Sequence, residues 1–300
     1  MQVTISGGTG FVGGHLLAQL LPAGAKVHLL TRQLRPGLPT GAVPFLWDHS
    51  RELAPADSLA GSDAVVHLMG EPVAQRWSPE IKRRIRESRV VSTRNLVDAM
   101  AAAETRPQML VSASAIGVYG SRGGEELDEE SVPGSDFLAE VCQEWEAEAL
   151  RAGEFGIRVL RLRLGIVLGA DGGALARMLP PFRIGVGGPL GSGEQWMSWI
   201  HISDLVGMML FALRYPHIQG VWNAVAPNPV PNAEFTRTLA RILKRPAVIP
   251  VPEFGLKLLF GEGAQALLAS QRVKPVAAEA AGFRFQYGGL HAALRHLLKS

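Results

Sequence analysis

Three glycines recur at three-residue spacing near the start of the chain, at Gly7, Gly10 and Gly13. Glycine in such a loop makes a tight turn and lets backbone N–H groups come close to the oxygens of a pyrophosphate. A β-branched run over 2–6 precedes the loop, and an apolar periodic segment over 14–21 follows it. Strand, turn and helix in this order would present the partial positive charge of a helix N-terminus to phosphates. The spacing predicts a dinucleotide-binding loop, with a glycine-rich structural turn as the alternative.

The end of the second predicted strand bears on the choice of dinucleotide. That strand spans 26–32 and ends with Thr31 and Arg32, with Arg35 close by. An NAD-binding unit usually carries a carboxylate about 20 residues beyond its glycines, where it holds the ribose 2′-hydroxyl. A hydroxyl and a guanidinium suit a 2′-phosphate instead, because arginine offers a fork of charged donors. The pair favours NADP over NAD, and a surface arginine at a strand end is the alternative.

Two further strand ends would border such a crevice, since ligands of open α/β sheets bind beyond the carboxyl ends of the strands. Asp48 ends a short strand over 43–48, where it could accept a hydrogen bond from the adenine amino group or cap the next segment. Leu68, Met69 and Gly70 end a continuously apolar run, as expected of a strand buried on both faces. These residues are expected to contact the dinucleotide.

Small hydroxyl residues lie where the next predicted strand, over 109–120, runs into a polar loop. They are Ser112 and Ser114, and Tyr119 follows them closely. Hydroxyl groups at the carboxyl end of a strand can contact a nicotinamide ring and donate a hydrogen bond to a substrate carbonyl. We therefore assign Ser112 to the cofactor and treat Ser114 as a candidate catalytic residue.

Strands and helices alternate through residue 169. The predicted strands cover 2–6, 26–32, 43–48, 63–70, 109–120 and 156–169, and the predicted helices cover 14–21, 79–103 and 136–152. This alternation is typical of parallel strands joined by helical crossovers. The fold class expected is α/β, with a doubly wound parallel sheet.

The composition changes beyond residue 169. Pro180 and Pro181 are expected to form a glycine-rich loop together with residues 185–193, and the remainder is mostly helical with a possible short hairpin around 283–287. Too few strands remain for an independent sheet, so we read this part as a smaller lobe that closes over the crevice. The predicted division is a dinucleotide-binding domain at 1–169 with 198–226 returning to it, and a C-terminal substrate lobe at 170–197 and 227–300.

The charge balance and the cysteine content exclude several classes. The formal net charge is +3, with one basic cluster at 82–86 that suits a solvated helix face, so we expect no nucleic-acid partner. A single cysteine, Cys142, fits a reducing compartment. We find no leader segment, no apolar run of about 18 residues and no metal-ligand spacing. The expectation is a cytoplasmic protein without a membrane partner or a metal, either a monomer or a homodimer.

Several longer strings point to one family. They are the glycine loop, the stretch 112–120, the strand exit 162–169, the segments 187–193 and 200–204, and the tetrad Ser270 to Val273. Together they resemble the extended, atypical short-chain dehydrogenase/reductase superfamily, and in particular the NAD-dependent epimerase/dehydratase-like proteins of the YfcH type. Those proteins end in a small domain of unknown function. The resemblance spans essentially the whole chain.

The resemblance implies a Rossmann-type fold that binds NADP. The cofactor contacts it implies come from the glycine loop with Phe11 and Val12, and from Thr31, Arg32, Leu68, Met69, Arg89 and Val167. Arg89 lies inside a helix, where an ordinary surface salt bridge is the alternative. Ser114 occupies the strand-end position of the superfamily's serine, which makes it the first candidate to orient a substrate carbonyl.

One departure from the superfamily concerns its chemistry. Its usual proton relay is a tyrosine four residues before a lysine, whose charge helps to depress the tyrosine pKa. Phe137 and Val141 stand at those two positions here. The three tyrosines of the chain, Tyr119, Tyr215 and Tyr287, are followed four residues later by glycine, glutamine and histidine. The standard relay is therefore absent from the sequence.

Two classes of function remain. The first is an NADP-dependent oxidoreductase or epimerase that acts on a small carbonyl or sugar-like substrate through a non-standard proton donor. Tyr119 and Glu140 are the candidate acids, Glu140 on condition that the cleft desolvates it and raises its pKa. The second is a dinucleotide-binding protein without turnover, such as a redox sensor or a partner-binding module. The substrate itself is unknown from the sequence.

Overall fold

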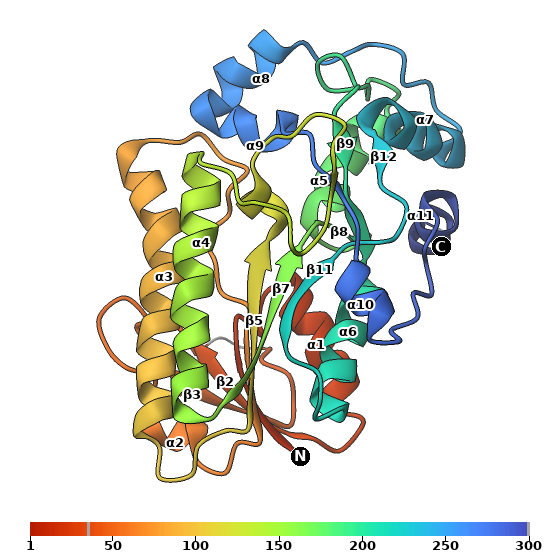
Figure 1. The fold of residues 1–300 in the computed structure, drawn as a ribbon. Coiled ribbons are helices and arrows are strands. Elements are labelled where there is room, and N and C mark those ends of the chain that lie inside the picture. Colours follow the sequence, from red (N-terminus) through yellow and green to blue (C-terminus); the bar gives the residue numbers. More distant parts are fainter. Residues whose placement is uncertain (35–36, 299–300) are drawn as a thin grey trace.

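A parallel sheet forms the centre of the lower part of the molecule (Figure 1). A computed structural model of the chain describes residues 1–34 and 37–298, so Arg35 lies outside the described residues. The sheet has seven strands in the order β11-β7-β5-β4-β1-β2-β3. They are β1 (Gln2–Ser6), β2 (Lys26–Thr31), β3 (Ala42–Leu46), β4 (Ala64–His67), β5 (Met109–Ala115), β7 (Arg158–Leu164) and β11 (Gly220–Ala224).

Helices cover both faces of this sheet, as Figure 1 shows. On one face α1 (Phe11–Leu20) and α6 (Ile202–Arg214) pack against side chains such as Val3 and Ile5. On the other face α3 (Pro79–Ala102) and α4 (Phe137–Leu150) cover Val65 and its neighbours. Successive strand residues point to opposite faces, so the apolar run of β4 is buried on both sides. The predicted doubly wound parallel sheet is confirmed.

The two long helices on that second face begin where their sequences predict. Ser78 caps α3 by accepting a hydrogen bond from the backbone N–H of Ile81, and Pro79 fills the first helical position. Asp136 caps α4 in the same way, through the backbone N–H of Ala139 at 2.9 Å. Both caps satisfy N–H groups that a helix leaves unpaired at its start.

Shorter elements form the upper part of the molecule, beyond the carboxyl ends of the strands. Strand β8 (Ile166–Leu168) pairs with β10 (Trp199–His201), β9 (Trp196–Met197) with β12 (Val230–Pro231), and β6 (Glu126–Leu127) with β13 (Arg272–Val273). The helices there are α5 (Gly173–Arg183), α7 (Asn232–Leu243), α8 (Glu253–Phe260), α9 (Ala264–Leu268) and α11 (Leu290–Leu298). The other short elements are α2 (Ala56–Leu59), α10 (Val276–Ala280), η1 (Ile116–Tyr119), η2 (Arg151–Phe155) and η3 (Gly261–Gly263).

The C-terminal residues pack into two cores. Leu290 and Leu294 of α11 join Trp199 and Phe235 in the core of the upper part. Phe283 packs into the core between the sheet and helices α1 and α6. The seventh strand, β11, pairs with β7 and so brings the predicted returning segment into the sheet. The boundaries of the two predicted domains stay a prediction.

Three local expectations were wrong. Within the described chain, residues 283–287 form no hairpin, because the Asp204 carboxylate accepts hydrogen bonds from the backbone N–H groups of Gln286 and Tyr287. Helix α5 runs through Pro180 and Pro181, which we expected to lie in irregular chain. Helix α1 begins at Phe11 rather than at residue 14, so the glycine loop is shorter than expected.

Strand β3 forms one edge of the sheet and carries a proline in its middle. The backbone N–H of Trp47, just beyond the strand, donates to the carbonyl of Thr31 in β2. Backbone N–H groups alternate in direction along a strand, so the position of Pro44 is one whose N–H would point away from β2. At the opposite edge α10 packs against β11.

Candidate functional site

A polar groove of about 620 Å³ lies at the carboxyl ends of β1, β2 and β4. Gly7 and Gly10 form one side of it and Thr31 and Arg32 another. The remaining predicted cofactor residues in its lining are Asp48, Leu68, Met69 and Gly70. The structure therefore brings eight of the predicted cofactor residues together around one groove.

The glycine loop leaves no room for a side chain at Gly7 or at Gly13. Gly7 has a φ of +74°, and a Cβ atom there would lie 2.9 Å from the backbone carbon of Leu68. A Cβ atom on Gly13 would lie only 2.4 Å from the carbonyl oxygen of Gly7. The loop thus packs backbone against backbone and exposes the start of α1, where no described side chain makes a cap. A helix N-terminus open in this way is suited to the pyrophosphate of a dinucleotide.

Phe11 and Val12 lie beneath the loop rather than in the groove. The ring of Phe11 fills the space next to Gly169, Gly172 and Gly173, where added Cβ atoms would lie 2.3–2.8 Å from it. Val12 packs against the core below the sheet. Phe11 therefore holds the chain that follows β8 against the start of α1, which positions the glycine loop without contact to the groove.

Arg32 offers a charge to the groove. It is exposed and forms no hydrogen bond or ion pair with any other described residue. Thr31, beside it, donates from its hydroxyl to the carbonyl of Gln33 at 3.0 Å. A 2′-phosphate at this corner would meet a guanidinium that is not already neutralised, so the residues fit NADP.

Asp48 and His49 form the far wall of the groove. The carboxylate of Asp48 accepts hydrogen bonds from the Ser50 backbone N–H at 3.2 Å and hydroxyl at 2.6 Å, which lower the Asp48 pKa. Asp48 thus caps a turn, as its alternative interpretation proposed, while it also lines the groove. His49 was missed by the sequence analysis. Burial and the nearby charge of Arg32 lower its pKa, and its Nδ1 atom has no partner among the described residues.

A second and larger cavity, of about 1010 Å³, adjoins the groove. The two share Leu68, Met69 and Gly70, so the end of β4 forms a wall of both. The cavity continues under a cover formed by residues 253–271, which we call the roof. Helices α8 and α9 of the roof lie above the carboxyl ends of β5 and β7 (Figure 1). A polar groove that opens into a roofed cavity can hold a dinucleotide and a second molecule side by side.

Arg89 and Val167 line this larger cavity rather than the groove. The Arg89 guanidinium donates to the backbone carbonyls of Ile85 and Glu71, both at 3.0 Å, and lies over the ring of Trp145. Burial lowers its pKa, although arginine stays charged at any ordinary pH. Ser112 is buried in the sheet, and its hydroxyl donates to the carbonyl of Ala113.

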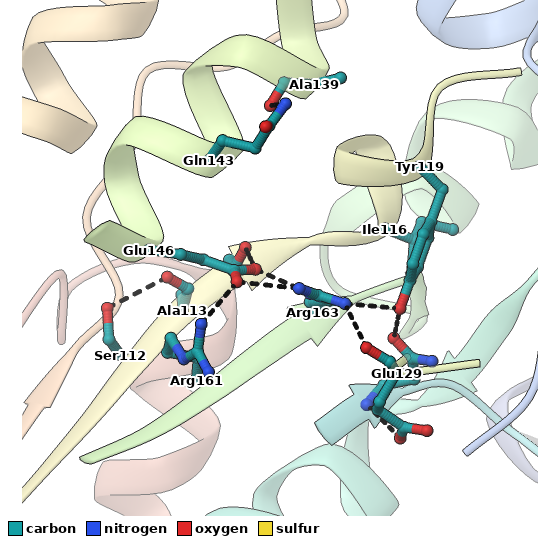
Figure 2. Close-up of polar contacts among 12 residues, drawn as sticks. Ser112, Ala113, Ile116, Tyr119, Glu129, Ala139, Gln143, Glu146, Arg161 and Arg163 are labelled. Atoms are coloured by element: carbon teal, nitrogen blue, oxygen red, sulfur yellow. Dashed lines mark hydrogen bonds and ion pairs between the residues drawn. The ribbon is translucent and has the colours of Figure 1, made fainter. Parts of the chain in front are cut away.

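Ser114 is the one candidate catalytic residue in the lining of the large cavity, and its hydroxyl is engaged elsewhere. Figure 2 shows the contacts around the carboxylate of Glu146. Ser114 donates to Glu146 Oε1 at 2.7 Å, and Arg163 donates to both carboxylate oxygens at 2.8 and 3.0 Å. Arg161 adds a bond of 3.0 Å to Oε2. Burial alone would lower the pKa of Arg163, but the bonds to Glu146 raise it.

The two candidate acids are not positioned for proton transfer in the cavity, and we do not retain them. Tyr119 is fully buried, and its hydroxyl donates to Asn223 and accepts from Arg163 (Figure 2). Burial raises its pKa. The side chain of Glu140 is 56% exposed on α4, 3.5 Å from Arg86. The condition set for Glu140, a desolvating cleft, is therefore not met.

The positions of the missing relay face the cavity. Phe137 and Val141 both line it, next to Cys142. Burial raises the pKa of the Cys142 thiol to about 12, so this cysteine is a packed helix residue and not a thiolate nucleophile. Apolar side chains thus occupy the wall where the superfamily would place tyrosine and lysine.

Sequence reasoning did not identify the roof or most of the aromatic side chains that line the cavity. Trp77, Trp145 and Trp196 line the cavity together with Leu267 and Leu268 of the roof. Their types alone do not distinguish them from core residues. The tryptophans in the segments before α3 and before β10 were the available signal.

Two absences complete the description of the chain. No helix formed by residues 1–34 or 37–298 combines the length and the apolar character needed to cross a membrane. Within the same residues, no three His, Cys, Asp or Glu side chains gather as a metal-ligand set.

Comparison with known proteins finds two family models that match this chain. Residues 3–224 match the model of the NAD dependent epimerase/dehydratase family, and residues 251–297 match a domain of unknown function, DUF1731. The epimerase family protein SDR39U1 homolog of Arabidopsis thaliana, described as chloroplastic, is 44% identical over all of this chain and 87% of its own length. The epimerase family protein YfhF of Bacillus subtilis is 36% identical over 99% of this chain and 98% of its own length.

Several solved structures have the same fold as this chain. Human epimerase family protein SDR39U1 with NADPH superimposes with a TM-score of 0.89 at 36% identity, and the match covers 99% of both chains. A nucleoside-diphosphate sugar epimerase from Corynebacterium glutamicum has a TM-score of 0.79 at 39% identity, over 99% of this chain and 58% of that one. A Thermus thermophilus UDP-glucose 4-epimerase in complex with NAD, at 21% identity and a TM-score of 0.79, shares the fold.

Proposed function

Because the chain belongs to the NAD dependent epimerase/dehydratase family, we propose that it binds NADP(H) and acts as an oxidoreductase or epimerase on a small carbonyl or sugar-like substrate. The observation that carries this proposal is the junction at Leu68, Met69 and Gly70, where a polar groove with a glycine loop meets a roofed cavity. When bound, the nicotinamide would supply or accept a hydride. The protein would hold the phosphates on the glycine loop and exclude water with the roof.

The choice of NADP over NAD rests on Arg32 and Thr31. A similar human protein is described with NADPH, whereas more distant structures are described with NAD. Arg32 has no competing ion pair among the described residues and lines the groove. A 2′-phosphate would gain charge-assisted hydrogen bonds from it.

We expect NADPH to bind at least tenfold more tightly than NADH, which corresponds to about 1.4 kcal/mol. The variant Arg32→Asp should lose this preference, because its carboxylate repels a 2′-phosphate and accepts a bond from a 2′-hydroxyl. Isothermal titration calorimetry with both cofactors measures the difference. Arg237→Asp is the matched control, since Arg237 is exposed on α7 and does not line the groove, and it should keep the preference for NADPH. Equal affinity of the unmodified protein for both cofactors would contradict the assignment.

Turnover needs a separate test, because binding alone does not make an enzyme. Deuterated NADPH, labelled at the transferable position, is incubated with the protein and a desalted pool of cellular metabolites. We expect label to appear in a small molecule only when the protein is present, as read by mass spectrometry. A protein that binds NADPH and moves no label would favour the second function class, with the proviso that an epimerase returning hydride to its cofactor leaves no label.

The second class, a dinucleotide-responsive protein without turnover, has one observation in its favour. Phe137 and Val141 wall the cavity where a tyrosine and a lysine would stand, and Tyr119 and Glu140 do not replace them. Such a protein would need no proton donor. For either class we propose the cytoplasm as the compartment, since the lone cysteine is unpaired and buried.

A further inference from the structure

The larger cavity is walled by rings and aliphatic side chains. Trp77 precedes α3, Phe137 opens α4 and Trp196 belongs to β9, so the aromatic wall comes from three separate parts of the chain. The rings of Trp77 and Phe137 meet edge to face with centroids 5.3 Å apart. Leu268 of the roof lines the same cavity. Flat apolar surfaces of this kind favour a ligand with rings of its own.

Several polar side chains in the lining are already paired within the protein, whereas the indole N–H of Trp145 has no partner among the described residues. Gln271 donates from Nε2 to two backbone carbonyls, both at 2.9 Å, and the hydroxyl of Ser198 donates to the backbone carbonyl of Gln271 at 2.8 Å. Asn232 accepts from a backbone N–H at 2.8 Å, and Ser121 accepts from another at 3.1 Å. A sugar that enters such a cavity would leave its hydroxyl groups without partners, which costs free energy.

The charges in the lining are unsuited to a diphosphate. The basic side chains among the described lining residues are Arg89 and Lys257, and Asp136, Glu253 and Glu262 oppose them. Arg89 is held by two backbone carbonyls. Lys257 lies 3.5 Å from Glu253. A nucleotide sugar carries two negative charges on its diphosphate, and recognition of phosphate groups relies on free arginine, lysine or helix N-termini.

We infer that the substrate of this cavity is an uncharged carbonyl compound with an aromatic or alicyclic body, and that nucleotide sugars are excluded. The inference rests on the proposed function, because it takes the cavity beside the dinucleotide groove to be the substrate site. The cavity volume of about 1010 Å³ leaves room for several rings. Recognition then depends on ring contact and on burial of apolar area, with the carbonyl as the one polar group.

The test measures binding and needs no turnover. The probe is prodan, a neutral naphthyl ketone whose emission moves to the blue in apolar surroundings. We expect prodan to bind with a blue-shifted emission while NADPH stays bound, and UDP-glucose to show no binding by calorimetry. A parallel NADPH titration reports on the groove, so that failure of the cofactor site and failure of the cavity assignment are seen separately.

A pair of leucine variants locates the probe. Leu268→Asn places an unpaired amide in the cavity wall, and we expect it to weaken prodan binding at least tenfold while NADPH binding is retained. Leu259→Asn is the matched control, because Leu259 is 66% exposed on α8 of the same roof. Its affinity for prodan should equal that of the unmodified protein.

Three results would overturn the inference. They are tighter binding of UDP-glucose than of prodan, equal prodan binding by the Leu268→Asn variant and the unmodified protein, and displacement of prodan by NADPH. Absence of NADPH binding would instead remove the proposed function. Even without NADPH binding, the cavity would be shown to be apolar if the Leu268→Asn variant lost prodan binding while the Leu259→Asn variant kept it.

Discussion

The carboxylate of Glu146 is buried, and the hydrogen-bond donors around it offset the free-energy cost of burying its charge. Its side chain is 6% exposed and accepts bonds from Ser114, Arg161 and Arg163, while Arg163 continues to Tyr119 (Figure 2). A buried ion pair adds little net stability, but removal of one partner leaves the other charge unpaired. These residues therefore tie together α4, β5, β7 and η1 below the cavity.

Glu146→Gln should lower the free energy of unfolding by roughly 3–5 kcal/mol, because two arginines lose their counter-charge in the interior. Glu144→Gln on the same helix is the control. Glu144 is 42% exposed and 3.1 Å from Arg86, and the loss there should stay below about 1 kcal/mol. Urea denaturation followed by circular dichroism measures both. Similar losses for the two variants would contradict a structural role for the Glu146 contacts.

His67 is a second buried polar residue, at the end of β4 beside the junction of groove and cavity. Its Nδ1 pairs with the hydroxyl of Ser6 at 2.5 Å and its Nε2 with that of Ser92 at 3.2 Å. Burial lowers its pKa from the ordinary value to about 3, and the nearby His49 contributes. His67 therefore stays neutral in the folded protein across the physiological range.

The pH dependence of stability should report this burial. Between pH 6.5 and pH 3 the unfolded chain binds a proton at this histidine that the folded chain does not, so acidification destabilises the fold. From pH 7 to pH 5 the contribution is about 2 kcal/mol. His67→Gln should show a correspondingly shallower loss of unfolding free energy between those two pH values, measured by urea denaturation at each. Parallel pH profiles would show that His67 titrates normally.

At the level of elements, the first turn of α1 contains adjacent glycines in opposite surroundings. A Cβ atom on Gly13 would lie 2.4 Å from the carbonyl oxygen of Gly7, whereas one on Gly14 would meet nothing within 4 Å. The first glycine is required by the close approach of loop and helix. The second weakens the helix, because glycine loses more backbone entropy on folding than alanine does.

Gly13→Ala and Gly14→Ala should therefore act in opposite directions. Alanine at 13 pushes the glycine loop outward, and we expect NADPH affinity to fall at least tenfold together with a loss of stability of about 1–3 kcal/mol. Alanine at 14 should raise stability by about 0.5–1 kcal/mol and leave NADPH binding unchanged. Thermal denaturation and NADPH titration separate the two. A loss of cofactor binding in both variants would argue against the packing explanation.

The elements that the sequence predicts well are those with a local signal. Strand β4 was recognisable because a strand that is buried on both faces has a continuously apolar sequence. Helix α3 was recognisable because its sequence is periodic and begins with a proline at the first helical position. Helix α5 and the segment 283–287 were not recognisable. Packing of Leu175 and Leu179 holds α5 through its two prolines, and the carboxylate of Asp204 holds the other segment from a distant helix.

At the scale of the molecule, residues 251–298 are not an appendage to the sheet domain. Phe283 packs in the core below the sheet, Lys274 donates to the carbonyl of Pro227, and Gln271 donates to carbonyls of Ile116 and Gly120. Removal of this region would uncover core and cavity together. The C-terminal region therefore contributes to the same core as the sheet.

We expect the full chain to unfold in one cooperative transition. Far-ultraviolet circular dichroism follows the central sheet and helices, while fluorescence follows the six tryptophans, three of which, Trp77, Trp145 and Trp196, line the cavity. The two signals should change at the same urea concentration. Two separate midpoints, with the fluorescence change first, would show that the roof unfolds independently.

The candidate site was only half predictable, for a physical reason. The glycine loop and Arg32 lie on one βαβ unit, so local spacing was enough to place them together. The cavity instead gathers residues as far apart as Trp77 and Leu268. An apolar side chain in a cavity wall looks the same in sequence as one in a core, and only the fold shows which of them face empty space. Ser114 was likewise predicted to orient a substrate carbonyl, but its hydroxyl donates to Glu146, which lies on another element.

Pro44 in β3 has a consequence for self-association. Exposed sheet edges invite a second copy to add its own strand, which is a common route to dimers and to aggregates. The missing N–H in the middle of β3 removes a donor that such an added strand would use, and α10 covers the other edge at β11. If two copies pair, as the sequence analysis left open, they should meet through helices rather than by extending one sheet into the next.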